Sequence, residues 1–204
     1  MSWPSDVRRR AEEIIARYPE VRSAVMPLLY LAMRQDGGLT LDGMREVAGY
    51  TGLTPVRVES VASFYSMYKR GAAGRYIVSV CTSISCHLLG GENVLDAVAD
   101  ETGVPSAETG TDGMFSIEAV ECIGACGGAP AVQVNYELIE GVTPDAGRRL
   151  CRWLAEEQPE VVGSDHMQAE FGGIRSFDWG PAEPVGAIGP VPAFGPYGSA
   201  GEVS

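Results

Sequence analysis

Long apolar runs are absent from this chain of 204 residues. The longest, residues 24–33, is interrupted by Pro27 and is too short to span a lipid bilayer. The first residues, MSWPSDVRRRAEE, lack the apolar stretch of a signal peptide, which predicts that the protein is not exported. In a reducing compartment, closely spaced cysteines bind metal or perform redox chemistry more often than they form structural disulfides.

Positive charge is also scarce. The chain has 15 Lys and Arg against 27 Asp and Glu, which gives a formal net charge of -12. Because nucleic-acid phosphates attract basic surfaces, this balance argues against a nucleic-acid partner. It argues equally against direct docking on an anionic membrane, so no direct membrane insertion is expected.

Several familiar motifs are missing. Neither close cysteine pair has two intervening residues, which disfavours a dithiol redox enzyme of the Cys-x-x-Cys type. The plant ferredoxin run Cys-x4-Cys-x2-Cys is absent as well. The chain has no Gly-rich phosphate loop after a strand and no Rossmann fingerprint, so we expect no nucleotide site on it.

The chain does contain two tight cysteine pairs. Four residues separate Cys81 from Cys86, three separate Cys122 from Cys126, and 35 lie between the pairs. Each pair follows an apolar stretch that predicts a strand, and each lies in a turn rich in small residues. Four thiolates are the ligand set of a 2Fe–2S cluster, so the pattern predicts an electron carrier.

Zinc is the alternative metal. Structural zinc sites usually hold cysteine pairs with two intervening residues, within a compact ribbon. The wider spacings here, with a predicted helix and strand between the pairs, favour the iron–sulfur interpretation. A zinc-stapled interaction module without a redox role stays open as an alternative.

The cluster would be an anion that becomes more negative on reduction, so it needs hydrogen-bond donors. Gly124, Gly127 and Gly128 lack β-carbons, and we expect their N–H groups to approach sulfur closely. Hydroxyl donors in the first loop are Thr82, Ser83 and Ser85. With few cations nearby, such a site favours the oxidised form, which predicts a low reduction potential.

Two further residues, His87 and Cys151, are of types that can bind metal. His87 follows Cys86 directly, and with four cysteines present it is interpreted as a neighbour of the cluster or an exposed side chain. Cys151 lies on a predicted helix whose inward face includes Leu150 and Leu154. We interpret Cys151 as a small packed thiol rather than a ligand.

The order of elements predicts an α+β fold in three parts: residues 1–72 as an N-terminal helical bundle, 73–158 as a mixed-sheet domain, and 159–204 as an extended tail rich in Gly and Pro. The predicted helices cover residues 6–16, 21–34, 40–48, 54–69, 92–102 and 143–157. The predicted strands cover residues 76–80, 115–120, 131–134 and 137–140, with a tight turn at 135–136. The tail is expected either to lie along a partner or to be solvated.

The runs CTSISCHLLGG and VECIGACGGAPAVQVN resemble the thioredoxin-like 2Fe–2S ferredoxin family. The resemblance covers residues 5 to about 157 and is strongest to the cluster-bearing subunits of NADH:quinone oxidoreductase, respiratory complex I, of the NuoE type. It implies a thioredoxin-like fold in the second part of the chain. Some members have proline before the second cysteine, where this chain has Ser85.

By this resemblance, Cys81 and Cys86 would hold one iron, and Cys122 and Cys126 the other. The cluster would exchange one electron with FMN on a partner subunit that also binds NADH. Other peripheral-arm subunits of complex I would be neighbours, placing the protein in the cytoplasm at the inner face of the cell membrane. Relatives in NAD-dependent formate dehydrogenases and hydrogenases leave an equivalent subunit there as an alternative.

Overall fold

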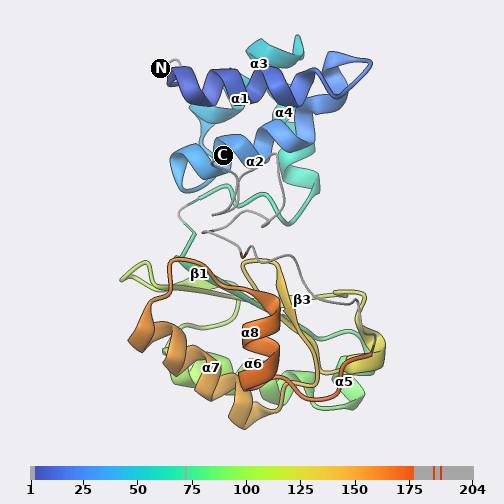
Figure 1. Ribbon diagram of the computed structural model, residues 1–204, viewed down its shortest axis with the longest axis vertical. Coiled ribbons are helices and arrows are strands. Elements are labelled where there is room, and N and C mark those ends of the chain that lie inside the picture. The colour runs from blue at the N-terminus through green and yellow to red at the C-terminus, as the bar shows by residue number, and fades with distance from the viewer. Residues whose placement is uncertain (1–2, 72, 177–185, 187–188, 190–204) are drawn as a thin grey trace. The chain divides into compact units, whose positions relative to one another are not determined.

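The computed structural model describes residues 3–71, 73–176, 186 and 189. The chain divides into two compact units after residue 72 (Figure 1). In the described residues the elements of the first unit are all helical, and the second unit contains a sheet with further helices. The predicted α+β class is confirmed.

The first unit is built around a buried helix. Its elements are α1 (Ser5–Ile15), the 3-10 turn η1 (Val21–Ala24), α2 (Val25–Asp36), α3 (Leu41–Thr51) and α4 (Pro55–Phe64). Eight of the twelve residues of α2 are buried, which is typical of a helix at the centre of a bundle. Thr40 and Thr54 cap the helices that follow them, because their hydroxyls accept hydrogen bonds from Gly43 N and Arg57 N.

Helix α4 is shorter than predicted. We expected it to run to residue 69, but it ends at Phe64 and Tyr65 is extended. The reason is tertiary: the Tyr68 hydroxyl donates to Met26 O at 3.0 Å, and Leu39 N donates to Lys69 O at 2.7 Å. These contacts bind residues 68 and 69 to other parts of the helical unit, and the helix ends before them.

The second unit contains a five-stranded sheet in the order β2-β3-β1-β4-β5. Its strands are β1 (Tyr76–Cys81), β2 (Glu108–Thr109), β3 (Phe115–Val120), β4 (Val132–Val134) and β5 (Glu137–Ile139). Strand β1 runs parallel to β3 and antiparallel to β4, while β2 and β5 pair antiparallel at the edges. The mixed sheet is confirmed, although the short β2 was not predicted.

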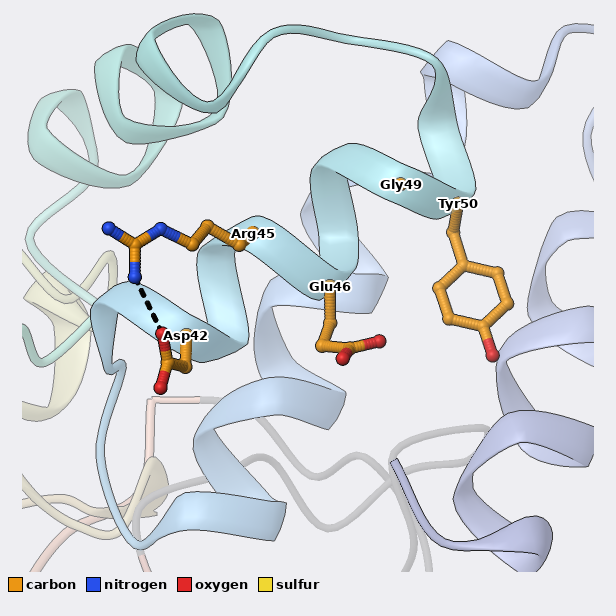
Figure 2. Close-up of a pocket in the computed structure, with 5 residues that line it drawn as sticks. All are labelled: Asp42, Arg45, Glu46, Gly49 and Tyr50. Atoms are coloured by element: carbon orange, nitrogen blue, oxygen red, sulfur yellow. Dashed lines mark hydrogen bonds and ion pairs between the residues drawn. The ribbon is translucent and has the colours of Figure 1, made fainter. Parts of the chain in front are cut away.

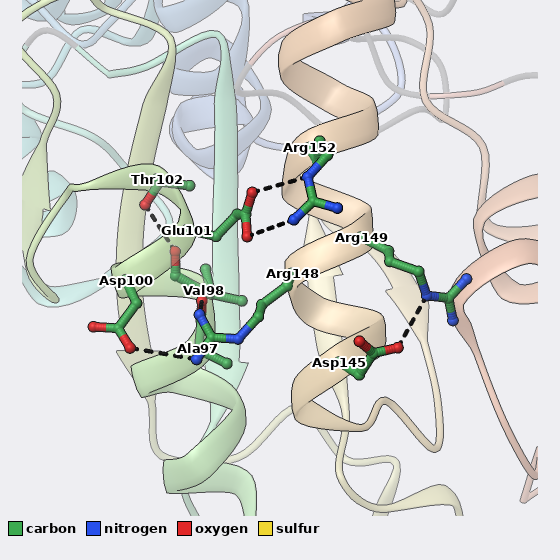
Figure 3. Close-up of polar contacts among 9 residues, drawn as sticks. All are labelled: Ala97, Val98, Asp100, Glu101, Thr102, Asp145, Arg148, Arg149 and Arg152. Carbon is green, nitrogen blue, oxygen red and sulfur yellow. Dashed lines mark hydrogen bonds and ion pairs between the residues drawn. The ribbon is translucent and has the colours of Figure 1, made fainter.

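Helices α5 (Ile84–Leu88), α6 (Gly91–Thr102), α7 (Pro144–Glu157) and α8 (Ser164–Phe171) complete this unit. Its core joins apolar side chains of the strands to those of α6, α7 and α8, including Val78, Val98 and Leu150. Helices α6 and α7 lie side by side (Figure 3). Across their exposed faces, Arg152 pairs with Glu101 through two hydrogen bonds of 3.1 and 3.0 Å, and Arg148 donates to Ala97 O.

Strands β4 and β5 form a hairpin with a two-residue turn, as predicted. Asn135 and Tyr136 occupy the turn with φ of 50° and 73°. Positive φ at both central residues is the type I′ geometry that matches the twist of the flanking strands. Asn135 is the residue type that tolerates this conformation best after glycine.

Part of the expected tail is folded. Residues 164–171, which we assigned to the extended segment from residue 159, form α8, and its Met167 and Phe171 join the core. The segment was misjudged because its few apolar side chains gain their burial only from α7 and the sheet. The expectation for residues 177–204 falls outside the described part of the chain, except at 186 and 189.

Candidate iron–sulfur site

The two cysteine turns leave the same edge of the sheet. Strand β1 ends at Cys81 and its parallel neighbour β3 ends at Val120, with these two residues in register. The carboxyl ends of adjacent parallel strands lie together, so the turns that follow them are neighbours. The hydrogen bond from Thr82 N to Val120 O, at 3.0 Å, continues the pairing past the end of β1.

The first turn holds Cys81 and Cys86 in a dry environment. Both side chains are buried and cluster with Ala131, which directly precedes β4. Gly91 makes this close turn possible, because a β-carbon there would lie 2.6 Å from Cys81 O and 2.9 Å from Cys86 O. The Cys81 thiol lies 3.9 Å from Glu121 O, which ties the first turn to the residue before Cys122.

The second turn presents its cysteines to solvent. Cys122 and Cys126 are both exposed, and Cys126 begins the 3-10 turn η2 (Cys126–Gly128). Gly124 adopts a φ of 91°, a conformation that side chains other than glycine rarely take. The four cysteines thus form a buried pair beside an exposed pair.

The pKa of the Cys86 thiol is raised to about 11. Burial is the main cause, a hydrogen bond from the Ala131 backbone lowers the pKa, and the neighbouring thiols of Cys81 and Cys126 add smaller raising effects. The electrostatic effect of Cys126 on Cys86 connects the two turns. A thiol in this position gives up its proton only when a cation compensates the charge, which is what a bound metal does.

The residues present fit a 2Fe–2S cluster in donor type, and the turns that carry them follow adjacent parallel strands. All five cysteines are free, so the four at the sheet edge are available as thiolates. Within the described residues, no three His, Cys, Asp or Glu side chains are already arranged around a single metal-ion position. The assignment of Cys81, Cys86, Cys122 and Cys126 as ligands stays a prediction.

The glycines after Cys126 allow close packing of another segment, and their approach to cluster sulfur stays a prediction. Gly128 N donates to Ala125 O at 3.2 Å, so this N–H is already satisfied within the turn. A β-carbon on Gly128 would overlap the Glu140 side chain, and one on Gly127 would lie 2.6 Å from Ser176 Cβ. The sequence interpretation missed Glu140 and Ser176. The glycine pair was the available signal, because it indicates close approach by another segment.

Two other predicted residues are placed clearly. His87 is exposed, and its Nδ1 lies 3.3 Å from Glu92 Oε1. Cys151 is buried in the core of the second unit, and burial followed by the charge of Glu101 raises the pKa of its thiol to about 12. The interpretation of Cys151 as a packed thiol is confirmed.

A hollow of about 360 Å³ lies in the helical unit beside α3 (Figure 2). Its lining carries both signs of charge, and Arg45 donates to Asp42 at 2.7 Å. Tyr50 at its end stacks on Trp3 with ring centroids 5.4 Å apart. Charged groups that pair with each other in an open hollow are typical of a solvated helix surface, so we assign no function to it.

The sheet with two cysteine turns at one edge defines a class: a small iron–sulfur domain for electron transfer. The chain belongs to the thioredoxin-like [2Fe-2S] ferredoxin family, whose sequence profile matches residues 11–154. The predicted family, the thioredoxin-like fold and the 2Fe–2S cofactor are confirmed by this membership. It favours the cluster over zinc.

Two named relatives are similar to this chain over most of its length. The chain is 42% identical over 164 residues to a subunit of NADH-quinone oxidoreductase from Mycobacterium tuberculosis strain H37Rv, covering 78% of this chain and 65% of that protein. It is 39% identical over 146 residues to a subunit of NADH-quinone oxidoreductase from Thermus thermophilus, covering 70% and 81%. The chain therefore spans about 65% of the length of its mycobacterial relatives.

Among solved structures, an NAD+-reducing [NiFe]-hydrogenase in the air-oxidized state is similar with a TM-score of 0.60. The similarity covers 72% of this chain and 25% of that one at 17% identity, so it shows the fold alone. In the part of this chain that the structure describes, we find no helix with the length and apolar character needed to cross a membrane.

Proposed function

We propose that this chain is the electron-transfer subunit of an NADH:quinone oxidoreductase, respiratory complex I. Its cluster is held by Cys81 and Cys86 on one iron, and by Cys122 and Cys126 on the other. A 2Fe–2S cluster accepts and releases one electron at a time. The relatives named as subunits of NADH-quinone oxidoreductase support this assignment.

The observation that carries the proposal is the meeting of both cysteine turns at one sheet edge, with one pair buried and the other exposed. The buried pair gives the cluster a dry, rigid attachment. The exposed pair leaves one side of the cluster near the surface, where a partner's redox group can approach. An electron relay needs both features.

The partner in this proposal is the subunit that binds NADH and FMN. Exposed apolar side chains support a docking surface beside the site: Ile84 and Leu88 on α5 and Leu89 after it are 74%, 77% and 61% exposed. Apolar surface of this kind next to a redox site is typical of a contact that is covered in an assembly. Through the complex, the protein lies in the cytoplasm, peripheral to the inner face of the cell membrane.

The proposal also includes the division of the chain into domains. Residues 1–72 form a helical domain, and the cluster domain begins at residue 73. The latter extends beyond 158, because α8 contributes to its core. We propose that the chain beyond Ser176, most of which lies outside the described residues, contacts a partner subunit.

The first test is composition. The purified protein is expected to contain two irons and two acid-labile sulfides per chain and to give an electron-spin signal on reduction. A colourless protein with bound zinc would overturn the proposal in favour of the zinc-stapled module. Isolation of the native assembly tests the partner.

In that isolation, quinone-reducing membrane subunits together with a flavin subunit support complex I. A molybdenum-containing or nickel-containing subunit in their place would assign the chain to a formate dehydrogenase or hydrogenase.

A further inference from the structure

A buried acid lies behind the turn that carries Cys126. Glu140, directly after β5, is only 3% exposed. Its Oε1 accepts hydrogen bonds from both the backbone N of Ser176, at 3.2 Å, and the Ser176 hydroxyl. Within the described residues Glu140 forms no ion pair, and Arg175, next to Ser176, pairs instead with Asp165 at 2.6 Å.

The Glu140–Ser176 pair covers the two residues that follow Cys126. A β-carbon on Gly128 would lie 2.7 Å from Glu140 Cβ and would overlap its carboxylate. Gly127 is covered by Ser176 in the same way. Gly141 N also donates to Gly128 O at 2.6 Å, so both side chain and backbone of this segment contact η2.

The position of Glu140 is itself fixed. Its backbone N donates to Gln168 Oε1 at 2.8 Å, and Gln168 Nε2 donates back to its carbonyl at 3.1 Å. Gly173 N donates to the same carbonyl at 2.8 Å. These three bonds fix the backbone of Glu140, and Ser176 holds its carboxylate, so the side chain is kept in place against η2.

We propose that Glu140, held by Ser176, positions the turn that carries Cys126 and lowers the reduction potential of the cluster by its fixed negative charge. The inference rests on the proposed cluster assignment. Reduction adds an electron to a site that is already anionic, and a buried carboxylate nearby makes that step less favourable. A single charge in this position changes the oxidised-to-reduced ratio on the order of tenfold.

The chain offers a matched control at Glu137. Its Oε2 accepts from Ser164 N at 3.1 Å and from the Ser164 hydroxyl at 2.5 Å, the same pair of donors that Ser176 offers Glu140. Glu137 begins β5 next to the hairpin turn, whereas Glu140 follows the other end of the strand. Three residues of extended chain put roughly 10 Å between the two positions.

The experiment compares the cluster-loaded full chain with its Glu140→Gln and Glu137→Gln variants. Glutamine keeps an oxygen acceptor for Ser176 and removes the charge. We expect Glu140→Gln to raise the midpoint potential, equivalent to a roughly tenfold change in the oxidised-to-reduced ratio, while Glu137→Gln leaves it unchanged. Equal potentials for Glu140→Gln and the unsubstituted chain, or equal shifts in both variants, would overturn the charge effect.

Ser176→Ala gives a second measurement that does not depend on Glu140→Gln holding its cluster. This variant keeps the Glu140 charge and removes the Ser176 hydroxyl, which donates a hydrogen bond to that carboxylate. The midpoint potential of the cluster is therefore expected to fall or stay unchanged. A rise would contradict the proposal.

The positioning role is tested in the cluster-free chain by amide hydrogen exchange. Glu140→Ala is expected to accelerate exchange at Gly128 N, which donates to Ala125 O within the turn. Glu137→Ala should leave that rate unchanged, and an unaltered rate in Glu140→Ala would contradict the positioning role. Because this measurement needs no cluster, it separates failure of this inference from failure of the proposed function, which a chain unable to bind iron and sulfide would show.

Discussion

Asn135 and Ile77 exchange two hydrogen bonds: Asn135 N donates to Ile77 O at 2.9 Å, and Ile77 N donates to Asn135 Oδ1 at 2.8 Å. The Asn135 side chain also donates to Arg75 O at 3.0 Å. This buried amide therefore fixes the hairpin to the beginning of β1, the strand that ends at Cys81. The two hydrogen bonds therefore join the turn between β4 and β5 to the strand that ends at the first cysteine pair.

Asn135→Ala is expected to destabilise the second unit by about 2–3 kcal/mol, because it leaves the buried Ile77 N and the partly buried Arg75 O without their side-chain partner and strains a positive φ. Asn135→Gly relieves the strain but not the lost hydrogen bonds, so its loss should be smaller. Denaturant unfolding of both variants measures the difference. Equal losses would show that the backbone conformation contributes nothing.

The ligand assignment is tested by single substitutions. Cys86→Ser and Cys122→Ser are expected to bleach or destabilise the cluster, because each removes a sulfur ligand. Cys151→Ser should leave the visible absorption spectrum intact, since Cys151 lies in the core of the second unit. Loss of the spectrum in the Cys151 variant would show that the assignment is wrong.

Gly91→Ala should impair cluster binding, because the new β-carbon would lie 2.6 Å from the Cys81 carbonyl, a backbone atom that cannot move without shifting the first turn. Gly49→Ala is the matched control. Nothing lies within 4 Å of a β-carbon there, and replacing glycine inside α3 should stabilise the helix by about 0.5–1 kcal/mol. Iron content and thermal unfolding of both variants check the pair.

The buried thiol of Cys151 predicts a pH dependence. Its pKa is raised to about 12 in the folded chain, from an ordinary value of 9.0. Between these values the unfolded chain loses this proton and the folded chain keeps it. The contribution of this thiol to the free energy of unfolding is therefore fully present below pH 9. It falls by about 1.36 kcal/mol per pH unit toward pH 12. Cys151→Ala should show a shallower decline than the unsubstituted chain in denaturant unfolding between pH 9 and 11. Identical slopes would contradict the assignment of this thiol as the cause.

The proposed docking surface predicts that a substitution on α5 weakens association with the partner and leaves the cluster content unchanged. Leu88→Glu places a charge on a side chain that is 77% exposed, so the fold and the cluster should be retained. Association with the flavin-binding partner should weaken at least tenfold if the partner covers α5, because a buried unpaired charge is costly. Co-purification with that partner and iron analysis provide the two measurements. Undiminished association would place the contact elsewhere.

Much of the fold followed from local signals. The capping threonines with proline predicted the starts of α4 and α7, and the alternation at residues 115–120 predicted β3 at its observed bounds. The parts that failed depend on distant residues. Helix α4 ends early where Tyr68 contacts Met26, and α8 forms where its apolar side chains reach α7 and the sheet.

The amino-acid sequence alone determined the identity and spacing of the four cysteines, the family and the class of cofactor, because these depend on residue types at short separations along the chain. Only the tertiary structure decided that Cys81 and Cys86 are buried while Cys122 and Cys126 are exposed, and that Glu140 lies against Gly128. Those relationships join residues from separate strands and turns. Their physical cause is the parallel pairing of β1 with β3 and the return of β5 beside β4, which no local pattern encodes.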